Sequence, residues 1–545
     1  MTRNLTSRSS LASLKREAKR WLRTLRANDP DARARFVRAH PHAPAHPGLR
    51  HVQQAIAREY GFPGWAELTA ELSRRHGDRP AAGKADVVPA LLLAAGKGDV
   101  ELVGQILDTH PDLVDERGAL GQSGLRTALH FGVAHEPVVR LLLEHGADPD
   151  VRDEGDNATA LHFAAERGDL DVVRLLVENG ADPTGEGTHH ELTALGWATC
   201  FDYAYHPDVA GYLLAHGARH TIHTAVAMGD TDAVRDLVAR DPADLERPMD
   251  ATNHHRRPLH LAVAKGQARA LTTLLDLGAD PEAEDAAGLT PLDQAALSGA
   301  RDLADLLVAR GAVVRLPAAV GLGRVTDVDR LLREDPGCLR PGGRWERLVL
   351  RASVRASGEV IDALIRRGAS VDVRDSPQTA VDGTHGYTAL HAAAFQGNLP
   401  AVRVLLRHGA SRTVREEKYL ATPVGWADYA GHTEIRDLIL DGPVDIIDAI
   451  AFDRLDRVTE LLADDPPALD RALGEFIPGD GRPSFDLSWT PLAYAAAHGK
   501  VDAARLLVER GADRSVRDSE GRGLRDIALA HGHTAVVELL DQYDT

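Results

Sequence analysis

The feature that most constrains the fold of this 545-residue chain is a short phrase that returns at a fixed spacing. Thr-Ala-Leu-His begins at Thr127 and again at Thr159, and Gly-Ala-Asp follows these copies at Gly146 and Gly180. Looser copies continue as far as Thr490-Pro491-Leu492. A repeat of about 33 residues indicates a stack of similar supersecondary units, because one such unit cannot enclose a core by itself.

The residues of one unit, 159–182, predict two short helices joined by a tight turn. Thr159 is a favoured N-cap, and we expect its hydroxyl to accept a hydrogen bond from a backbone N–H of the first turn. Apolar residues recur at helical spacing until Gly168-Asp169, and Gly180 closes the second helix, where a left-handed residue is favoured. In another unit Pro423 takes the first helical position, which needs no N–H donor. The predicted fold class is therefore all-α, a solenoid of about fourteen helix pairs.

The repeated phrase resembles the ankyrin repeat, over roughly residues 90–540. The resemblance implies a non-catalytic scaffold that binds another protein through a concave groove and through finger loops between the helix pairs. Four of the fourteen units are degenerate, because an acid or a histidine followed by proline replaces the Gly-Ala-Asp end. These prolines are Pro111, Pro242, Pro336 and Pro466.

Four segments are expected along the chain: a basic helical N-terminal domain over 1–80, a linker over 81–89, repeats 1–7 over 90–315 and repeats 8–14 over 316–545. The two blocks of repeats are alike internally. Leu195-Gly196-Trp197-Ala198 matches Val424-Gly425-Trp426-Ala427, 229 residues later. We therefore expect the first seven units to superpose on the last seven, with Trp197 over Trp426.

Several connections between units are longer than a tight turn, and most fall where the fingers of such an array project. They are residues 184–192, 247–257, 376–387, 414–421 and 471–488. Insertions in repeat proteins gather on one face, which is often the binding face.

The charge of the chain is unevenly distributed. The net charge is −18, yet residues 1–80 carry 16 Lys/Arg against 7 Asp/Glu, so the rest carries 47 against 74, a balance of −27. An acidic solenoid favours a basic protein partner and argues against nucleic acid. Arginine outnumbers lysine by 56 to 7, which suggests a GC-rich, bacterial genome.

Cysteine content and apolar runs point to a cytoplasmic protein. Two cysteines, Cys200 and Cys338, cannot form a disulfide framework. The sequence opens with no apolar leader, and no apolar run approaches the ~18 residues of a membrane span.

The sequence lacks the motifs of common catalytic sites. Gly185-Glu186-Gly187 lacks the rest of a phosphate-binding fingerprint, and there is no P-loop lysine motif or Gly-x-Ser-x-Gly elbow. We therefore predict no enzyme activity and no cofactor. An enzyme on this scaffold is the third hypothesis, after a small-molecule or metal sensor built on the long loops.

The histidines are expected to be structural and not metal ligands. His130, His162, His260 and His391 fill the fourth place of the phrase, and the resemblance implies hydrogen bonds within the repeat and to its neighbour. The loop pairs His189-His190 and His254-His255 are separated by two units, so we expect their side chains not to converge on one metal.

Exposed aromatic residues are the main candidates for partner binding. Phe395, Gln396 and Tyr429 lie near the end of a first helix, at positions that face the partner in ankyrin repeats. Trp197 and Trp426 have two interpretations: each ring fills the space left by the missing histidine, or each anchors a partner in the groove. The remaining candidates are Glu166, Arg167, His189 and His190.

The N-terminal helix has basic residues around one apolar stripe formed by Leu11, Leu14, Ala18, Leu22 and Leu25. The stripe favours burial, as a cap that covers one end of the array. Alternatively, residues 10–27 contact an acidic partner, an anionic membrane surface or nucleic acid.

Overall fold

The computed structural model describes residues 84–120, 124–251, 253–375, 386–476 and 486–543, together with parts of 14–71. Within these residues the chain is helical, and its strand-like pairings are three isolated bridges, one of them between Arg152 and Thr159. The predicted all-α class is confirmed. The chain divides into two compact units, residues 1–288 (unit 1) and 289–545 (unit 2).

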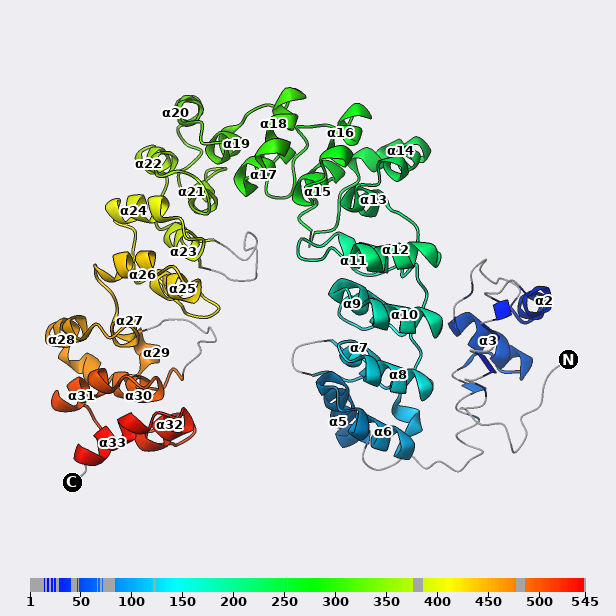
Figure 1. The fold of residues 1–545 in the computed structure, drawn as a ribbon, viewed down its shortest axis with the longest axis horizontal. Coiled ribbons are helices and arrows are strands. Elements are labelled where there is room, and N and C mark those ends of the chain that lie inside the picture. The colour runs from blue at the N-terminus through cyan, green and yellow to red at the C-terminus, as the bar shows by residue number, and fades with distance from the viewer. Residues whose placement is uncertain are drawn as a thin grey trace. The chain divides into compact units, whose positions relative to one another are not determined.

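Unit 1 contains two described N-terminal helices and then six helix pairs (Figure 1). The N-terminal helices are α2 (Pro30–Ala39) and α3 (Leu49–Glu59). The pairs are α5 (Lys84–Lys97) with α6 (Val100–Thr109), α7 (Ala128–Gly132) with α8 (Glu136–Glu144), α9 (Ala160–Arg167) with α10 (Leu170–Glu178), α11 (Ala194–Thr199) with α12 (Pro207–Ala215), α13 (Ile222–Met228) with α14 (Thr231–Arg240), and α15 (Pro258–Ala264) with α16 (Ala268–Asp276).

Unit 2 contains eight pairs and the short helix α29 (Leu473–Phe476). The pairs are α17 (Pro291–Ser298) with α18 (Arg301–Ala309), α19 (Leu316–Gly321) with α20 (Val325–Glu334), α21 (Leu348–Ser353) with α22 (Gly358–Arg366), α23 (Ala389–Phe395) with α24 (Leu399–Arg407), α25 (Pro423–Tyr429) with α26 (Thr433–Leu440), α27 (Ile446–Ala451) with α28 (Leu455–Asp464), α30 (Pro491–Ala497) with α31 (Val501–Glu509), and α32 (Leu524–Ala530) with α33 (Thr534–Tyr543). The described residues therefore contain the fourteen pairs that the sequence predicts.

Within each unit, first helices pack on first helices and second helices on second helices. Thus α9 packs on α11 and α23 on α25, while α10 packs on α12 and α22 on α24. The buried side chains are mostly alanine, valine and leucine. Small residues let short helices approach closely, so each pair adds one thin apolar layer.

The helix boundaries shorten the predicted linker. Helix α5 begins at Lys84, inside the segment 81–89, and continues through Pro89. Unit 1 ends at Gly288, before the seventh helix pair. The predicted boundary between the two blocks of repeats, at 315/316, falls after that pair. Trp197 and Trp426 each occupy the fourth position of their first helix, α11 and α25. The duplication of the whole seven-pair block stays a prediction.

The histidine phrase links each pair to the next one. The His162 ring lies with Nε2 2.7 Å from the Gly185 carbonyl oxygen, and that of His130 with Nε2 3.2 Å from the Ala158 carbonyl oxygen. His391 makes the same contact with Ala421, at 3.3 Å. The predicted hydrogen bonds to the neighbouring repeat are confirmed.

The expected cap at Thr159 is present as a capping box, in which His162 also takes part. Nδ1 of His162 accepts from the Thr159 backbone N–H at 3.1 Å and lies 3.0 Å from the Thr159 hydroxyl. The histidine ring therefore contacts both the backbone and the hydroxyl of the residue that caps its helix. In the unit with Gly196 in place of histidine, the Thr193 hydroxyl does accept from the Gly196 N–H, at 3.2 Å.

The N-terminal helices have a core of their own. Leu14, Ala18, Leu22 and Leu25 are buried there, as the apolar stripe predicts, and Leu11 lies outside the described residues. Arg35 completes this core from α2. Its guanidinium lies 3.7 Å from the centre of the Trp21 ring and pairs with Glu17 at 2.8 Å and Glu59 at 2.6 Å.

Three of the four degenerate units end in a short 3-10 helix in place of the Gly-Ala-Asp turn. These helices are Pro111–Leu113, Pro242–Glu246 and Pro466–Leu469. We still expect the degenerate layers to open first, because neighbours supply most of the stability of a solenoid. Amide exchange should be fastest near 221–247 and 316–341 and slower at 124–182 and 388–442. Uniform protection across all fourteen pairs would contradict this expectation.

Acidification should weaken the histidine-linked layers. Burial lowers the pKa of His130 and His162 to about 4, below the 6.5 of an unfolded chain. The folded form therefore binds fewer protons, and its stability is full above pH 6.5 and falls as pH drops towards 4. We expect a loss of about 2 kcal/mol per histidine by pH 5.

Amide exchange of residues 128–182, corrected for intrinsic rates, measures this loss between pH 7.5 and pH 5. The control variant H130Q/H162Q lacks both titrating rings and should show a flatter profile. Equal opening free energies at both pH values in the wild-type chain would contradict the expectation.

Candidate functional site

A cluster of aromatic rings surrounds Trp426 in unit 2, and we call Phe395, Tyr419, Trp426 and Tyr429 the unit-2 patch. Ring centres of Trp426 and Phe395 are 5.4 Å apart at 85°, and those of Trp426 and Tyr429 are 5.7 Å apart at 80°. Tyr419 lies 5.9 Å from Trp426. Such edge-to-face contacts fix the rings relative to one another.

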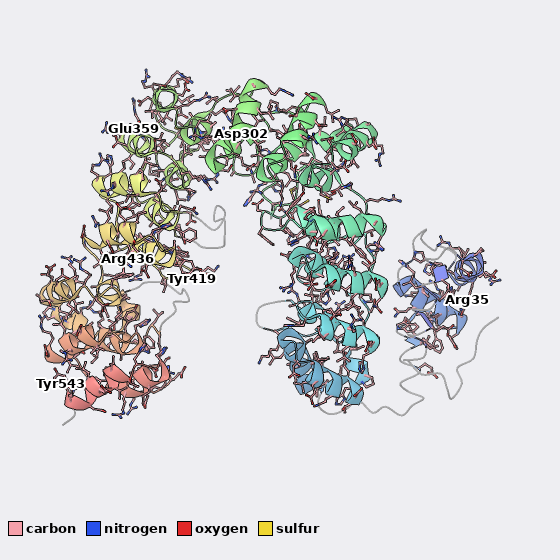
Figure 2. The ribbon with its side chains drawn as sticks, viewed as in Figure 1. Arg35, Asp302, Glu359, Tyr419, Arg436 and Tyr543 are labelled. Atoms are coloured by element: carbon pink, nitrogen blue, oxygen red, sulfur yellow. The ribbon has the colours of Figure 1, made fainter. Side chains whose placement is uncertain are left out.

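Exposure rises outward through this patch. Trp426 and Phe395 are half-buried, whereas Tyr419 is 46% exposed and Tyr429 is 79% exposed. Figure 2 shows Tyr419 beside α25 and Arg436 on α26. Arg436 pairs with Asp428, the residue before Tyr429, at 3.1 Å. An aromatic surface therefore lies next to a carboxylate that is already in an ion pair.

The finger 414–421, which carries Tyr419, is held by buried charges. The Glu416 carboxylate is fully buried and accepts from the backbone N–H groups of Lys418 and Tyr419, each at 2.8 Å. Arg415 pairs with Asp445 at 2.6 Å and donates to the Leu420 carbonyl at 2.6 Å. The finger is therefore ordered without a ligand.

The same network reaches the helix that carries Trp426. The Thr422 hydroxyl, at the start of α25, donates to Asp448 at 2.7 Å, and Arg415 lies 3.5 Å from Asp448. Burial, with the neighbouring Asp445, raises the pKa of the Asp448 carboxyl. Asp448 occupies the fourth place of its degenerate phrase, where other units have histidine.

A pocket of about 520 Å³ adjoins the unit-2 patch at Asp428. It lies between the helix pairs α25–α26 and α27–α28, with Phe452 as an apolar wall. Its other charged lining residues are Arg436, Asp437, Asp441, Asp453, Arg454 and Lys500.

A second cluster surrounds Trp197 in unit 1, and we call Phe163, Trp197, Phe201 and Tyr203 the unit-1 patch. Phe163 and Phe201 lie edge-on to Trp197, with ring centres 5.3 and 5.5 Å away. Tyr203 stacks on Phe201 at 5.7 Å and 9°. Trp197 is 3% exposed and Tyr203 is 75% exposed, so exposure again rises outward from a tryptophan.

The finger 184–192 supports this patch from one side. Both ring nitrogens of His190 contact carboxylates: Nδ1 lies 3.1 Å from Asp250 and Nε2 3.2 Å from Asp156. The His190 ring also packs edge-on against Trp197 and Phe201. His189 Nδ1 lies 2.9 Å from the Gly155 carbonyl oxygen.

The two histidine-bearing fingers meet through His190 and Asp250, although two units separate them in sequence. In the described part of the chain, however, no group of three or more histidine, cysteine or acidic side chains is arranged to hold a metal ion.

The structure brings together the predicted binding residues in two groups. Phe395, Gln396, Trp426 and Tyr429 lie at or beside the unit-2 patch, with Gln396 exposed at the end of α23. Glu166, Trp197, His189 and His190 belong to the surroundings of the unit-1 patch, and Arg167 is exposed at the end of α9. Most of the predicted finger 376–387 lies outside the described residues.

The indole N–H groups of Trp197 and Trp426 are buried and have no hydrogen-bond partner among the described residues. An unsatisfied buried donor costs about 1–3 kcal/mol. The packing of each indole against its neighbouring rings must therefore contribute more than this cost. For Trp197, this packing supports the interpretation that the ring fills the space left by the missing histidine.

Sequence reasoning missed the turn 200–206, which carries Phe201, Tyr203 and Tyr205. Seven residues separate α11 from α12, where Gly168-Asp169 suffices between α9 and α10. The unusual length of this turn and its three aromatic residues were the signals in the sequence that could have identified it. Cys200, in the same turn, is buried, and burial raises its pKa to about 11, so its thiol is a poor nucleophile.

Among the described residues, none of the helices is both long enough and apolar enough to span a lipid bilayer. This agrees with the lack of a long apolar run in the sequence.

Comparison with known families gives the same repeat. The profile described as "Ankyrin repeats (3 copies)" matches residues 135–223, 222–317 and 348–450, and that of "Ankyrin repeats (many copies)" matches 492–540. Together the matches cover 335 of the 545 residues.

Similar curated proteins come from eukaryotes. The chain is 31% identical over 185 residues to neurogenic locus notch homolog protein 2 of Homo sapiens, which is 34% of this chain and 6% of that protein. It is 24% identical over 327 residues to ankyrin repeat protein nuc-2 of Neurospora crassa, which is 60% of this chain and 24% of that protein. It is 30% identical over 197 residues to E3 ubiquitin-protein ligase XB3 of Oryza sativa subsp. japonica, which is 36% of this chain and 38% of that protein. The chain thus spans well under half of each of these relatives, and its bacterial origin stays a prediction.

Replacement of Lys265 should loosen the aromatic turn of unit 1. The Lys265 ammonium donates to the carbonyl oxygens of Phe201 and Ala204, and burial lowers its pKa. In K265M we expect the opening free energy of residues 200–206 to fall by about 1–2 kcal/mol. Amide exchange measures the change, with K500M in unit 2 as the control of equal charge. Unaltered exchange at 200–206 would show that Lys265 does not hold the turn.

Proposed function

Because the chain belongs to the ankyrin repeat family, we propose that it is a non-catalytic scaffold that binds a basic segment of a partner protein at the unit-2 patch and its finger 414–421. These residues come from first helices and a finger, the elements that line the groove implied by the family. In this proposal Phe395 and Tyr429 are the main contacts, with Gln396 and the edge of Trp426 beside them.

One observation carries the proposal: Tyr429 is 79% exposed although two other rings, those of Phe395 and Trp426, hold it in place. Packing of the solenoid does not require an aromatic ring in water at this position. Tyrosine and tryptophan are enriched among the residues that dominate binding energy. A ring that is already fixed also loses little conformational freedom on binding.

Charge supports a basic partner. The array beyond residue 80 has a balance of −27, and the rim of the patch carries Asp428. The adjoining pocket has four aspartates against three basic residues, namely Asp428, Asp437, Asp441 and Asp453 against Arg436, Arg454 and Lys500. Acidic surroundings steer a basic segment towards the rings and add specificity more than affinity.

The test uses the full chain and a defined probe, a peptide of about twelve residues with lysine and arginine spaced by glycine and serine. Truncation of anchor residues commonly costs 2 kcal/mol or more, so we expect F395A/Y429A to weaken binding at the unit-2 patch at least tenfold. Binding should also weaken as salt screens charges beyond about 8–10 Å.

The control variant is L529A, because Leu529 is also exposed in unit 2 but lies on α32, away from the patch. It should bind the peptide like the wild-type chain. Circular dichroism should show that F395A/Y429A keeps its helical content. Truncation of the half-buried Phe395 should lower the thermal stability, whereas Y429A alone should leave it unchanged, since Tyr429 is mostly exposed. Wild-type affinity at this site in the folded double variant would contradict the proposal.

The role of residues 10–27 stays a prediction. The apolar side chains that the structure describes in this segment lie in the N-terminal core, while its basic side chains lie outside the described residues.

A further inference from the structure

We infer that unit 1 carries a second docking surface for the same class of ligand, a lysine- or arginine-bearing segment, with Tyr203 as its anchor. The chain would then bind two basic segments, one on each unit. This inference rests on the proposed function for the nature of the ligand, but it concerns different residues.

The turn that carries Tyr203 is fixed by five contacts. Lys265 binds two of its carbonyl oxygens, and Arg256 pairs with Asp202 at 2.6 Å. The Tyr203 hydroxyl donates to Glu166 at 2.6 Å, and Nε2 of His206 lies 2.9 Å from the Glu166 carbonyl oxygen. The 75% exposure of Tyr203 is therefore a property of an ordered turn.

The two patches share a framework but not all of their rings. Trp197 and Trp426 correspond, and His190 and Tyr419 both lie three residues before the threonine that begins the next helix. The residues that follow them, Glu191 and Leu420, both have a positive φ, of 53° and 56°. The outermost tyrosines do not correspond, since Tyr203 lies in the inserted turn and Tyr429 in the helix.

This difference matters for the inference. Duplication alone would place an exposed ring at the same position in both units. Instead, each unit places a mostly exposed tyrosine at the edge of a ring cluster around a buried or half-buried tryptophan, by a different local route. Packing explains the tryptophans, but it does not explain why both outermost rings are left in water.

The chemistry around Tyr203 selects a cation. Glu166 accepts from the Tyr203 hydroxyl, and Asp202 precedes Tyr203 in the turn. Burial together with the Glu166 carboxylate raises the pKa of the Tyr203 hydroxyl. Aromatic faces in this chain already hold basic groups: the Arg126 guanidinium lies 4.4 Å from the centre of the Phe163 ring. A lysine or arginine of a partner can lay its apolar stem on Tyr203 and direct its charge to Glu166 or Asp202.

The experiment is a calorimetric titration of the full chain with the same basic peptide, which counts the sites. The wild-type chain should bind two peptides. Y203A and Y429A should each bind one, and Y203A/Y429A should bind none in the same concentration range. Y203F keeps the ring and should retain two sites, which separates loss of the ring from loss of the hydrogen bond to Glu166.

The outcomes distinguish the two proposals. One site that Y429A removes and Y203A leaves unchanged would overturn this inference and keep the proposed function. One site that only Y203A removes would overturn the unit-2 site and keep this one. No binding by the wild-type chain, or equal binding of a matched glutamate peptide, would overturn the shared ligand chemistry and with it both proposals.

Discussion

The structure depends on one recurring link, in which the fourth residue of a repeat phrase reaches the next helix pair. His130, His162 and His391 make this link to a backbone carbonyl of the following connection. Each histidine also binds the threonine that begins its own helix, so one ring joins two layers. In one degenerate unit the fourth residue makes a different link, because Asp448 accepts from Thr422 of the preceding pair. A solenoid has few contacts beyond nearest neighbours, and this link therefore sets how the layers stack.

The two aromatic patches lie in units whose phrase has glycine in place of the histidine. Gly196 and Gly425 occupy the fourth place of their phrases, and a tryptophan follows each of them. The indoles make no hydrogen bond among the described residues, so ring contacts and the fingers hold these layers together. Departures from a local rule are expected at functional sites. The break in the repeat chemistry and the exposed tyrosines therefore occur together.

Much of the fold was predictable from sequence because repeat periodicity, caps and histidine links are local. Fourteen pairs, the proline at the start of α25 and the left-handed Gly180 all follow from residues close in sequence. The unit-2 residues Phe395 and Tyr429 were predicted for the same reason. The Tyr203 turn was not, since its order depends on Lys265, about sixty residues away. Likewise, the contact of His190 with Asp250 depends on how two fingers project, which spacing along the chain does not reveal.

The most direct test of this account is an amide-exchange footprint of the full chain with and without a partner protein captured from the native host. Protection is predicted at residues 414–431, where the unit-2 patch and its finger lie, and at 199–206, the turn of Tyr203. The second helices α10 and α26 should exchange as in the free chain. Protection confined to those second helices, with 414–431 and 199–206 unchanged, would contradict the account.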